Sequence, residues 1–430
     1  MVGQYILDWS HQRFSELSYS VLGKEEDVSF GYIPAFNFFG DIFQLGAICE
    51  RNLYDEVLQS TSAIDMNGHG VYRSFVDVVI LDEIMRQKPD QISLLRRLDR
   101  IRTGNVTRDD WIDINKRSYA SLTEEEKENF SQEKSNTICL CETWEEAKKY
   151  NKSVLNSKTL SGDRVVSAEI ISTGRGRHHV SEKESMGQIP NVCVVAAGCR
   201  VILTRNQGEL TRLGLNNGAI GTVISIIYRD GEKPPNFPEA VIVDFPKYRG
   251  PSWISNKPTW IPITVNSVMC DNKCCSREGF PLIPGYAITI AKSQGMTIGK
   301  KEQINSAIIK LSDKINMEKL AYGTAYTAFS RVTEDSDWCL AEPIPFERLE
   351  YLNRHPKKKV REAEEKRLAK LSEVTISNNK CSQSQYIKLL QEIDEFCNDG
   401  VMDAVCTETG ECSCIYHGYV IQDLESPSKH

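Results

Sequence analysis

The chain has 430 residues, of which 40% are hydrophobic and 26% are charged, and its net charge is −7. This length and composition are typical of a globular protein with two or three domains. The net charge argues against a nucleic-acid binder that is basic throughout, although a local basic groove remains compatible with it. No apolar run is long enough to span a membrane, so no membrane partner is expected. The 14 cysteines, mostly scattered, are typical of reduced thiols inside the cell.

The first segments combine a helix with a polar strand end. Apolar residues at helical spacing predict an amphipathic helix over Met1–Ser20. An aromatic strand at Phe36–Phe39 is then expected to run into Gly40 and Asp41, with Gln44 three residues after the aspartate. A carboxylate there could hold a metal-bound water, and an amide could sense a phosphate. Alternatively, the aspartate caps the next helix.

A second strand is predicted over Tyr72–Leu81, and it leads to Glu83, Arg86 and Gln87. An arginine at a strand-to-helix junction suits bidentate contact with a phosphate or carboxylate, with an ordinary surface arginine as the alternative. The next predicted elements are helices over Ile92–Arg102, Asp109–Phe130 and Thr143–Leu155, and a strand over Thr137–Leu140.

The middle of the chain changes character. Leu160–Pro190 is polar, rich in serine and glycine, and basic at its centre, which is typical of a loop or β-ribbon. From Val192 to about Pro284 the pattern consists of short β runs bounded by Gly, Pro, Asn or Asp. Such spacing predicts a small antiparallel barrel rather than βαβ units.

The α/β pattern returns at Tyr286–Thr297. A short buried strand over Ala287–Ile290 ends at Lys292-Ser293-Gln294-Gly295. Ligands of open α/β sheets bind beyond the carboxyl ends of strands, so this polar cluster is a candidate site, and Gly295 allows a tight turn beneath it. An ordinary strand-to-helix turn is the alternative.

The last informative element is Gly323–Val332. Tyr326 and Phe329 share one face at helical spacing, and Ser330-Arg331 lie near one end. An arginine that reaches a transferring phosphate accelerates its transfer, whereas a structural arginine is the alternative.

Beyond Glu350 the chain is expected to form a mixed-charge helix with a solvated face, a nuclear-import signal being the alternative. A zinc site in the tail is not favoured, because no C-x₂₋₄-C pair occurs among Cys397, Cys406, Cys412, Cys414 and His417.

The order of these motifs resembles the Pif family of DNA helicases, which are 5′-to-3′ motors of superfamily 1B related to RecD-like enzymes and to the helicase half of Helitron transposons. The resemblance rests on GDIFQL, LDEIMRQ, GCRVILTRN…GLNNGAIGTV, AITIAKSQGMT and AYTAFSRV, and it spans about Met1–Ala341. It implies an α/β protein with an incomplete first RecA-like domain (1–70) and a second RecA-like domain (71–187 and 284–345). An SH3-like β-barrel (188–283) would be inserted into the second domain. Beyond the range of the resemblance, the composition itself predicts a charged helix and a flexible, Cys-containing tail (346–430).

The resemblance also implies roles for individual residues. Gly40, Asp41 and Gln44 look like motif III, in which the glutamine reads the γ-phosphate. Arg86, beside Gln87, is similar to the motif IV arginine that reaches ATP. Arg331 resembles the arginine finger of motif VI. The stretch around Lys292 is similar to motif V, in which Gln294 and Gly295 would face the nucleotide. Thr289, Lys292 and Ser293 of the same motif would face DNA. The implied ligands are ATP with Mg²⁺, and single-stranded and duplex DNA.

Several departures from the family pattern bear on activity. Ala291 replaces a histidine, which predicts a weaker grip on DNA, and Gly46-Ala47-Ile48 replaces prolines, which predicts a less rigid loop. The sequence contains no G-x-x-x-x-G-K-[ST] and no Walker B carboxylates, so Met1 is expected to follow Walker B. The sequence therefore resembles the carboxy-terminal portion of a helicase, and by itself it is not expected to hydrolyse ATP. The alternative is a non-catalytic DNA-binding or scaffold protein derived from such a helicase or from a Helitron. The expected location is nuclear, with mitochondria as the alternative.

Overall fold

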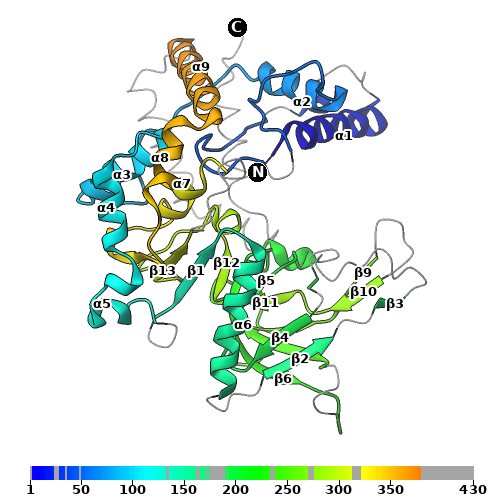
Figure 1. The fold of residues 1–430 in the computed structure, drawn as a ribbon. Coiled ribbons are helices and arrows are strands. Elements are labelled where there is room, and N and C mark those ends of the chain that lie inside the picture. Colours follow the sequence, from blue (N-terminus) through cyan, green and yellow to red (C-terminus); the bar gives the residue numbers. More distant parts are fainter. Residues whose placement is uncertain are drawn as a thin grey trace, which may run out of the picture. The chain divides into compact units, whose positions relative to one another are not determined.

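The computed structural model describes residues 2–23, 29–33, 36–47, 50–131, 135–160, 165–169, 172–173, 189–190, 192–232, 238–269, 276–311 and 321–378 (Figure 1). Its contacts divide the chain into two units. The first comprises Met1–Tyr72 and Asp82–Glu365, and the second comprises Arg73–Leu81 and Lys366–His430. Each unit is described by itself below.

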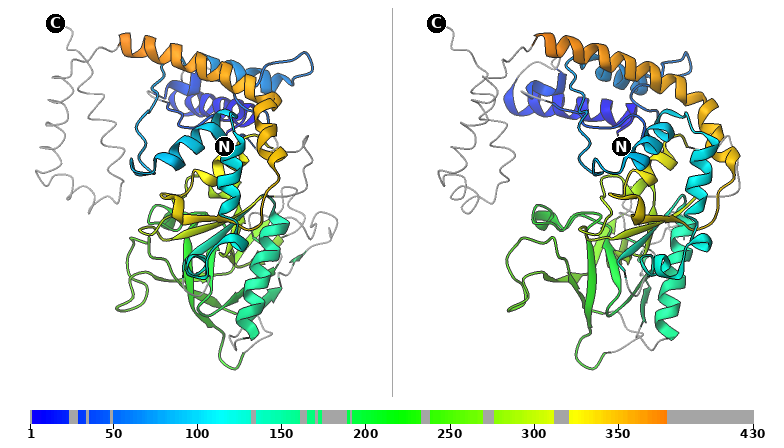
Figure 2. Two further views of the ribbon diagram at one scale, coloured as in Figure 1. Left: turned by 60° about the vertical axis from the view of Figure 1, so that its left-hand side comes forward. Right: turned by 90° about the vertical axis from the view of Figure 1, so that its left-hand side faces the viewer.

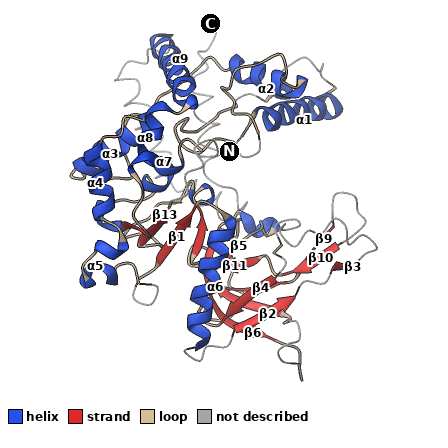
Figure 3. Ribbon diagram, viewed as in Figure 1, coloured by secondary structure: helices blue, strands red, loops and turns tan. Residues whose placement is uncertain are grey.

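A four-stranded parallel sheet lies at the centre of the first unit (Figure 3). Its strands follow the order β12-β1-β13-β14, with bounds Ala287–Thr289, Thr137–Cys141, Ser306–Lys310 and Trp338–Leu340. The strands are short and almost wholly apolar, as is typical of a parallel sheet that is covered on both faces. The strands predicted over 137–140 and 287–290 are therefore confirmed, as is the α/β class.

Successive residues of β1 enter two different cores. Ile138 and Leu140 belong to one, and Cys139 and Cys141 belong to the other, because neighbouring side chains on a strand point to opposite faces. The first core is packed by α3 (Ile92–Thr103), α4 (Arg108–Lys116), α7 (Thr324–Phe329) and α8 (Phe346–Arg354). The second core is covered by α6 (Trp144–Leu160), which runs beside the sheet in both views of Figure 2, with η2 (Tyr119–Ser121) and α5 (Glu124–Glu128) nearby in the chain. This helix–sheet–helix layering is consistent with the RecA-like expectation.

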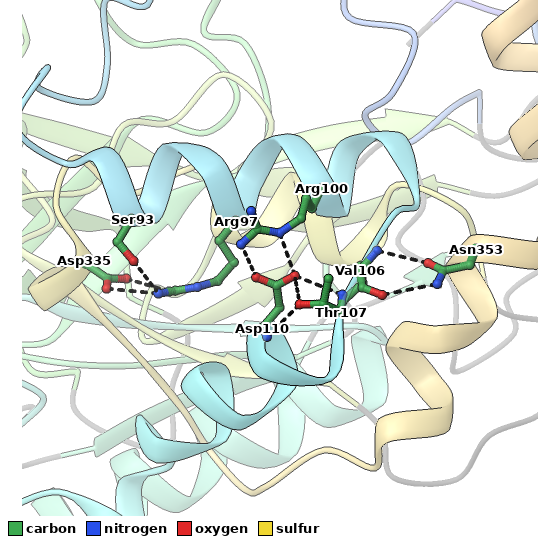
Figure 4. A network of polar contacts seen from close by, with 8 residues as sticks. All are labelled: Ser93, Arg97, Arg100, Val106, Thr107, Asp110, Asp335 and Asn353. Carbon is green, nitrogen blue, oxygen red and sulfur yellow. Dashed lines mark hydrogen bonds and ion pairs between the residues drawn. The ribbon is translucent and has the colours of Figure 1, made fainter.

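A polar network fixes α3 to its neighbours (Figure 4). Arg100 donates from Nε to Oδ2 of Asp110 at 2.7 Å, and that oxygen also accepts from the backbone N–H of Thr107 at 2.9 Å. The Thr107 hydroxyl in turn accepts from the Asp110 N–H, which completes a capping box at the start of α4. One turn earlier on α3, Arg97 pairs with Asp335 at 3.0 Å. The helices on this face of the sheet are therefore held by partly buried charge pairs as well as by apolar packing.

An antiparallel β region is inserted between α6 and β12. Its main sheet has the order β11-β5-β6-β7-β8, and its apolar side chains form a core of their own. The predicted antiparallel region is confirmed, while its SH3-like topology stays a prediction. The strands are β2 (Val165–Glu169), β3 (Ser172–Thr173), β4 (Val192–Ala196), β5 (Arg200–Leu203), β6 (Ile220–Ile227), β7 (Ala240–Asp244), β8 (Trp260–Thr264), β9 (Asn266–Met269), β10 (Ser276–Gly279) and β11 (Leu282–Pro284).

The amino-terminal segment confirms one expectation and corrects two. The predicted first helix is α1 (Gln4–Leu22), which is followed by η1 (Ser29–Tyr32) and α2 (Ala63–Ser74). The strand predicted over Phe36–Phe39 is wrong, because these residues have irregular backbone and no neighbouring strand among the described residues. The strand predicted over Tyr72–Leu81 is also wrong. Its first residues end α2, and the rest is an irregular segment whose apolar side chains are largely exposed.

The predicted mixed-charge helix is α9 (Pro356–Asn378), whose first ten residues belong to the first unit and whose remainder belongs to the second. Within the second unit, the backbone N–H of Val78 donates to the Thr375 hydroxyl at 2.9 Å. The five tail residues considered for zinc lie outside the described residues. No helix in the described part of the chain is long and apolar enough to cross a membrane.

Candidate nucleotide and DNA sites

The loop that carries Asp41 and Gln44 is built around the aspartate. Asp41 Oδ1 accepts from the Phe43 N–H at 2.9 Å, and Oδ2 accepts from Gln44 Nε2 at 3.2 Å. The Phe43 side chain is fully buried, and the Leu45 N–H donates to the Thr327 hydroxyl of α7 at 3.0 Å. Of the two roles left open by the sequence, capping is the one that these contacts support, although Asp41 caps a turn and not a helix.

The same loop is seated closely on the start of α7. Gly323 precedes this helix with φ +95°, and a Cβ there would lie 2.7 Å from the backbone carbonyl of Gln44. Glycine is therefore required both for the backbone conformation and for the close approach. The consequence is that Gln44 lies against the first turn of the helix that leads to Arg331.

Arg331 follows the carboxyl end of α7 and is 1% exposed. Its Nε donates to the Thr327 carbonyl at 2.9 Å, and its Nη2 donates to the Ser330 hydroxyl at 2.8 Å. Burial lowers the pKa of Arg331 to about 10, and the neighbouring charge of Arg86 acts in the same direction.

Arg86 and Gln87 reach the same turn from the other side. Arg86 donates from Nη1 to the Ser330 carbonyl at 3.0 Å and from Nε to the Thr297 hydroxyl at 3.2 Å. Gln87 donates from Nε2 to the carbonyls of Ser330 at 3.3 Å and Val332 at 2.8 Å. Burial lowers the pKa of Arg86 as well.

Neither guanidinium forms an ion pair with a carboxylate in the part of the chain that the structure describes. Two partly desolvated arginines that share one residue, Ser330, and lack a counter-ion form a strong candidate site for an anion. A polyphosphate fits this pair of cations, since its terminal phosphate would supply the missing negative charge.

Gln294 joins the end of β12 to the loop after Gln44. Its Nε2 donates to the Leu45 carbonyl at 3.3 Å, and Gly295 follows it with φ +85°. The tight turn expected at Gly295 is confirmed. The structure thus brings together six of the eight predicted nucleotide-site residues, namely Asp41, Gln44, Arg86, Gln87, Gln294 and Arg331. The other two, Gly40 and Gly295, are exposed and lie beside them in the chain.

Tyr326 was expected to be a core residue, and the structure places it among the charges of the candidate site. Burial, followed by the charge of nearby Asp41, raises the pKa of its phenol. Arg102 and Arg331 oppose that rise. Helical spacing alone could not reveal this role, because a tyrosine on an apolar helix face is usually a packing residue.

Arg361 of α9 is a second residue that sequence reasoning missed. It is 1% exposed, donates from Nη1 to the Phe43 carbonyl at 2.9 Å, and lies 4.8 Å above the Tyr322 ring. The mixed charges of α9 favoured a solvated face and gave no sign of a buried arginine. Its hydrogen bond to Phe43 therefore stabilises the loop that carries Gln44.

The residues predicted to face DNA differ in their exposure. The Thr289 hydroxyl accepts from the Lys292 N–H at 3.2 Å, and the Ser293 hydroxyl donates to the Ile290 carbonyl at 2.7 Å. Both side chains are buried, so they shape the turn η5 (Ala291–Ser293). Lys292 is half-buried, and burial lowers the pKa of its ammonium group. Among the three, Lys292 is the residue whose side chain is partly exposed.

A metal site is not evident from the described residues, which contain no group of three or more His, Cys, Asp or Glu side chains arranged to hold an ion. Asp41, the acid nearest the arginines, already accepts from donors of its own loop. The residues therefore fit the phosphates of ATP, but they do not by themselves fit Mg²⁺.

No protein-family model and no curated protein matches this sequence. Solved structures of Pif1 helicases do match the fold. A Candida albicans Pif1 helicase is 21% identical with a TM-score of 0.56, over 85% of this chain and 74% of that one. A Bacteroides Pif1 helicase in complex with ADP-AlF3 and ssDNA is 19% identical with a TM-score of 0.55, over 85% and 73%. A structure on unwinding of forked dsDNA by two coordinating Pif1 helicases is 19% identical with a TM-score of 0.53, over 81% and 68%. The resemblance inferred from the motifs is thus confirmed at the level of the fold, and over most of its length the chain has the fold of the Pif1 helicases.

Proposed function

We propose that these residues form the phosphate-sensing and DNA-holding part of an ATP-dependent, 5′-to-3′ DNA helicase of the Pif type. The observation that carries the proposal is the convergence of Arg86 and Arg331 on Ser330, with no carboxylate partner for either guanidinium among the described residues. The fold supports the same proposal, because the Bacteroides Pif1 helicase with a similar fold was solved in complex with ADP-AlF3 and ssDNA. A nuclear location, or a mitochondrial one, is proposed on the same resemblance.

On the nucleotide side, Gln44 would read the γ-phosphate while Arg86 and Arg331 neutralise the charge that develops on it. Gly40, Asp41, Gln87, Gln294 and Gly295 would shape the surrounding backbone. ATP supplies the transferring phosphoryl group when bound, and the Mg²⁺ ligands would have to come from residues other than those described.

On the DNA side, Lys292 would bind the phosphates of a single strand, with Thr289 and Ser293 holding the turn that presents it. Such contacts give affinity that depends strongly on salt and little on sequence. In the proposed motor, closure of the two RecA-like domains on ATP would move this strand and separate the duplex ahead of it. The barrel inserted between α6 and β12 is proposed to be SH3-like.

The proposal is tested on two levels. The 430-residue chain should bind single-stranded DNA but show no DNA-stimulated ATP turnover, because its sequence has no P-loop. In a chain extended by a P-loop segment, Arg331→Ala should abolish turnover and unwinding while DNA binding persists. Turnover by the 430 residues alone, or full unwinding by the extended Arg331→Ala variant, would contradict the assignment.

A non-catalytic DNA-binding or scaffold protein is the second candidate. It is favoured by the contacts of Arg331 with Thr327 and Ser330, which would suit a purely structural arginine. In that case Arg331→Ala would lower thermal stability in every form of the protein, and no extended form would hydrolyse ATP.

A further inference from the structure

The carboxyl ends of two adjacent strands bring an aromatic ring and a cation together. β1 and β12 pair in parallel, with Cys141 opposite Thr289, so both strands end at the same edge of the sheet. After β1 the chain enters α6, whose first residue is Trp144. After β12 the turn η5 presents Lys292, and its Nζ lies 5.8 Å from the centroid of the Trp144 ring. This edge is where open α/β sheets bind their ligands.

Trp144 is unusually open for its position. Its side chain is 47% exposed at the start of a helix, and its indole N–H has no hydrogen-bond partner in the described part of the chain. Two residues further on, the carboxylate of Glu146 is occupied, since it accepts from the Thr143 N–H at 3.2 Å and the Thr143 hydroxyl at 3.1 Å. The ring therefore has a cation over it at cation–π distance, and the acid two residues away is engaged in capping.

Lys292 complements the ring. It forms no ion pair with any residue that the structure describes, and burial lowers the pKa of its ammonium group, so an approaching anion would stabilise its charged form. An exposed aromatic face beside an unpaired cation is the arrangement with which proteins hold single-stranded nucleic acid, the ring stacking on a base and the cation meeting the backbone.

We propose that Trp144 and Lys292 form one nucleotide subsite, in which an unpaired base stacks on the indole and Lys292 binds the adjoining phosphate. The subsite rests on the proposed DNA side of the protein and adds to it a base contact that no sequence motif indicated. Since every base has a stacking face, the subsite would not read sequence. It would select single-stranded over duplex DNA, because paired bases do not expose their faces.

The test separates bases from phosphates. Affinities are measured by fluorescence anisotropy for an oligothymidylate of about 12 nucleotides and for an abasic strand of the same length. The variants are Trp144→Ala, Trp144→Phe and Lys292→Gln, each checked by circular dichroism for retained folding. Trp253→Ala is the matched control, because Trp253 is 55% exposed in the inserted β region and its removal also deletes one exposed indole.

Trp144→Ala should weaken binding of oligothymidylate by about 5- to 100-fold, the effect expected for one stacked base, and should leave the abasic strand unaffected. Trp144→Phe should retain most of the affinity. Lys292→Gln should weaken binding of both strands and reduce the dependence of log K on log salt by about one phosphate contact. Trp253→Ala should not change the affinity for either strand.

Equal affinity of Trp144→Ala and the parent chain for oligothymidylate would overturn the subsite while leaving the DNA-binding proposal intact. Equal losses on both strands would also overturn it, since the ring would then act through the backbone or the fold. A parent chain that binds neither strand would overturn the subsite together with the proposed function.

Discussion

The Asp110→Asn substitution tests the polar network that holds the helical face of the sheet (Figure 4). Asp110 is 3% exposed, and its carboxylate accepts from the guanidinium of Arg100 and from both the N–H and the hydroxyl of Thr107. Asparagine preserves the shape, but it replaces one acceptor oxygen with an NH₂ group that would face one of these donors. A hydrogen bond to a charged group contributes about 1.5–3 kcal/mol, so we expect a loss of about 2–3 kcal/mol in the free energy of unfolding.

The assay is thermal unfolding followed by circular dichroism, with Asp109→Asn as the control. Asp109 is exposed in the same first turn of α4, so its substitution removes the same charge without breaking the network. Loss of a charge near a helix terminus costs about 0.3–1 kcal/mol. At about 2–4 °C per kcal/mol for a domain of this size, Asp110→Asn should lower the midpoint by about 4–12 °C and the control by about 1–4 °C.

The pH dependence gives an independent check. Burial alone would raise the pKa of Asp110, but the hydrogen bonds from Arg100 and Thr107 outweigh burial and hold the pKa below its ordinary value of 3.8. A depressed pKa in the folded state means that the unfolded chain binds more protons in acid. The stabilisation is therefore complete well above pH 3.8 and is lost as the pH falls toward the folded-state pKa. Equal midpoints for Asp110→Asn and Asp109→Asn at neutral pH, or a difference between them that persists undiminished in acid, would refute this reasoning.

Three further predictions concern the candidate sites. Gly295→Ala should lower the free energy of unfolding by about 1–2 kcal/mol, because a φ of +85° is unfavourable for a residue with a Cβ. Gly323→Ala should lower it further, because the added Cβ would also lie 2.7 Å from the backbone of Gln44. Equal melting midpoints for the two variants would contradict this prediction. Arg361→Met should cost about 1–3 kcal/mol by leaving two buried carbonyls without their donor, and an unchanged urea midpoint would argue against the contact. Ser293→Ala should cost about 1 kcal/mol in stability with no loss of DNA affinity, in contrast to Lys292→Ala, and a DNA-binding defect in Ser293→Ala would show that the hydroxyl reaches DNA.

Patterns of apolar residues predicted the elements that are buried in this chain. The strand at Thr137–Cys141 and the helix at Ile92–Thr103 were found because their apolar spacing reports directly on the packing that stabilises them. The same reasoning failed at Phe36–Phe39 and Tyr72–Leu81, which have strand-like composition but, among the residues that the structure describes, no neighbour that completes a hydrogen-bond ladder. A strand is defined by its partner, and composition contains no information about whether a partner is present.

The candidate site was predictable where its residues belong to motifs, and hidden where they act through tertiary contacts. Arg86 and Arg331 could be named because they belong to motifs that occur in a recognisable order along the chain. Tyr326 and Arg361 could not, since one resembles a core residue and the other a surface charge. Trp144 is a similar case. Its place in the sequence predicts only the start of a helix. The subsite proposed for it depends on the parallel pairing of β1 with β12, whose paired residues are almost 150 positions apart in the sequence.

The arrangement around Asp41 explains why Arg86 and Arg331 form no ion pair with a carboxylate in the described part of the chain. Asp41 is a carboxylate whose charge acts on Arg331, so in a simpler fold the two would be expected to pair. Here the carboxylate accepts hydrogen bonds from the Phe43 N–H and from the Gln44 side chain. Those bonds satisfy the oxygens of Asp41, so the two guanidinium groups donate to weaker, neutral acceptors. Burial therefore disfavours the charged form of Arg331, as its lowered pKa shows. A bound phosphate would offset that unfavourable effect, which supports the proposed nucleotide site over a purely structural network.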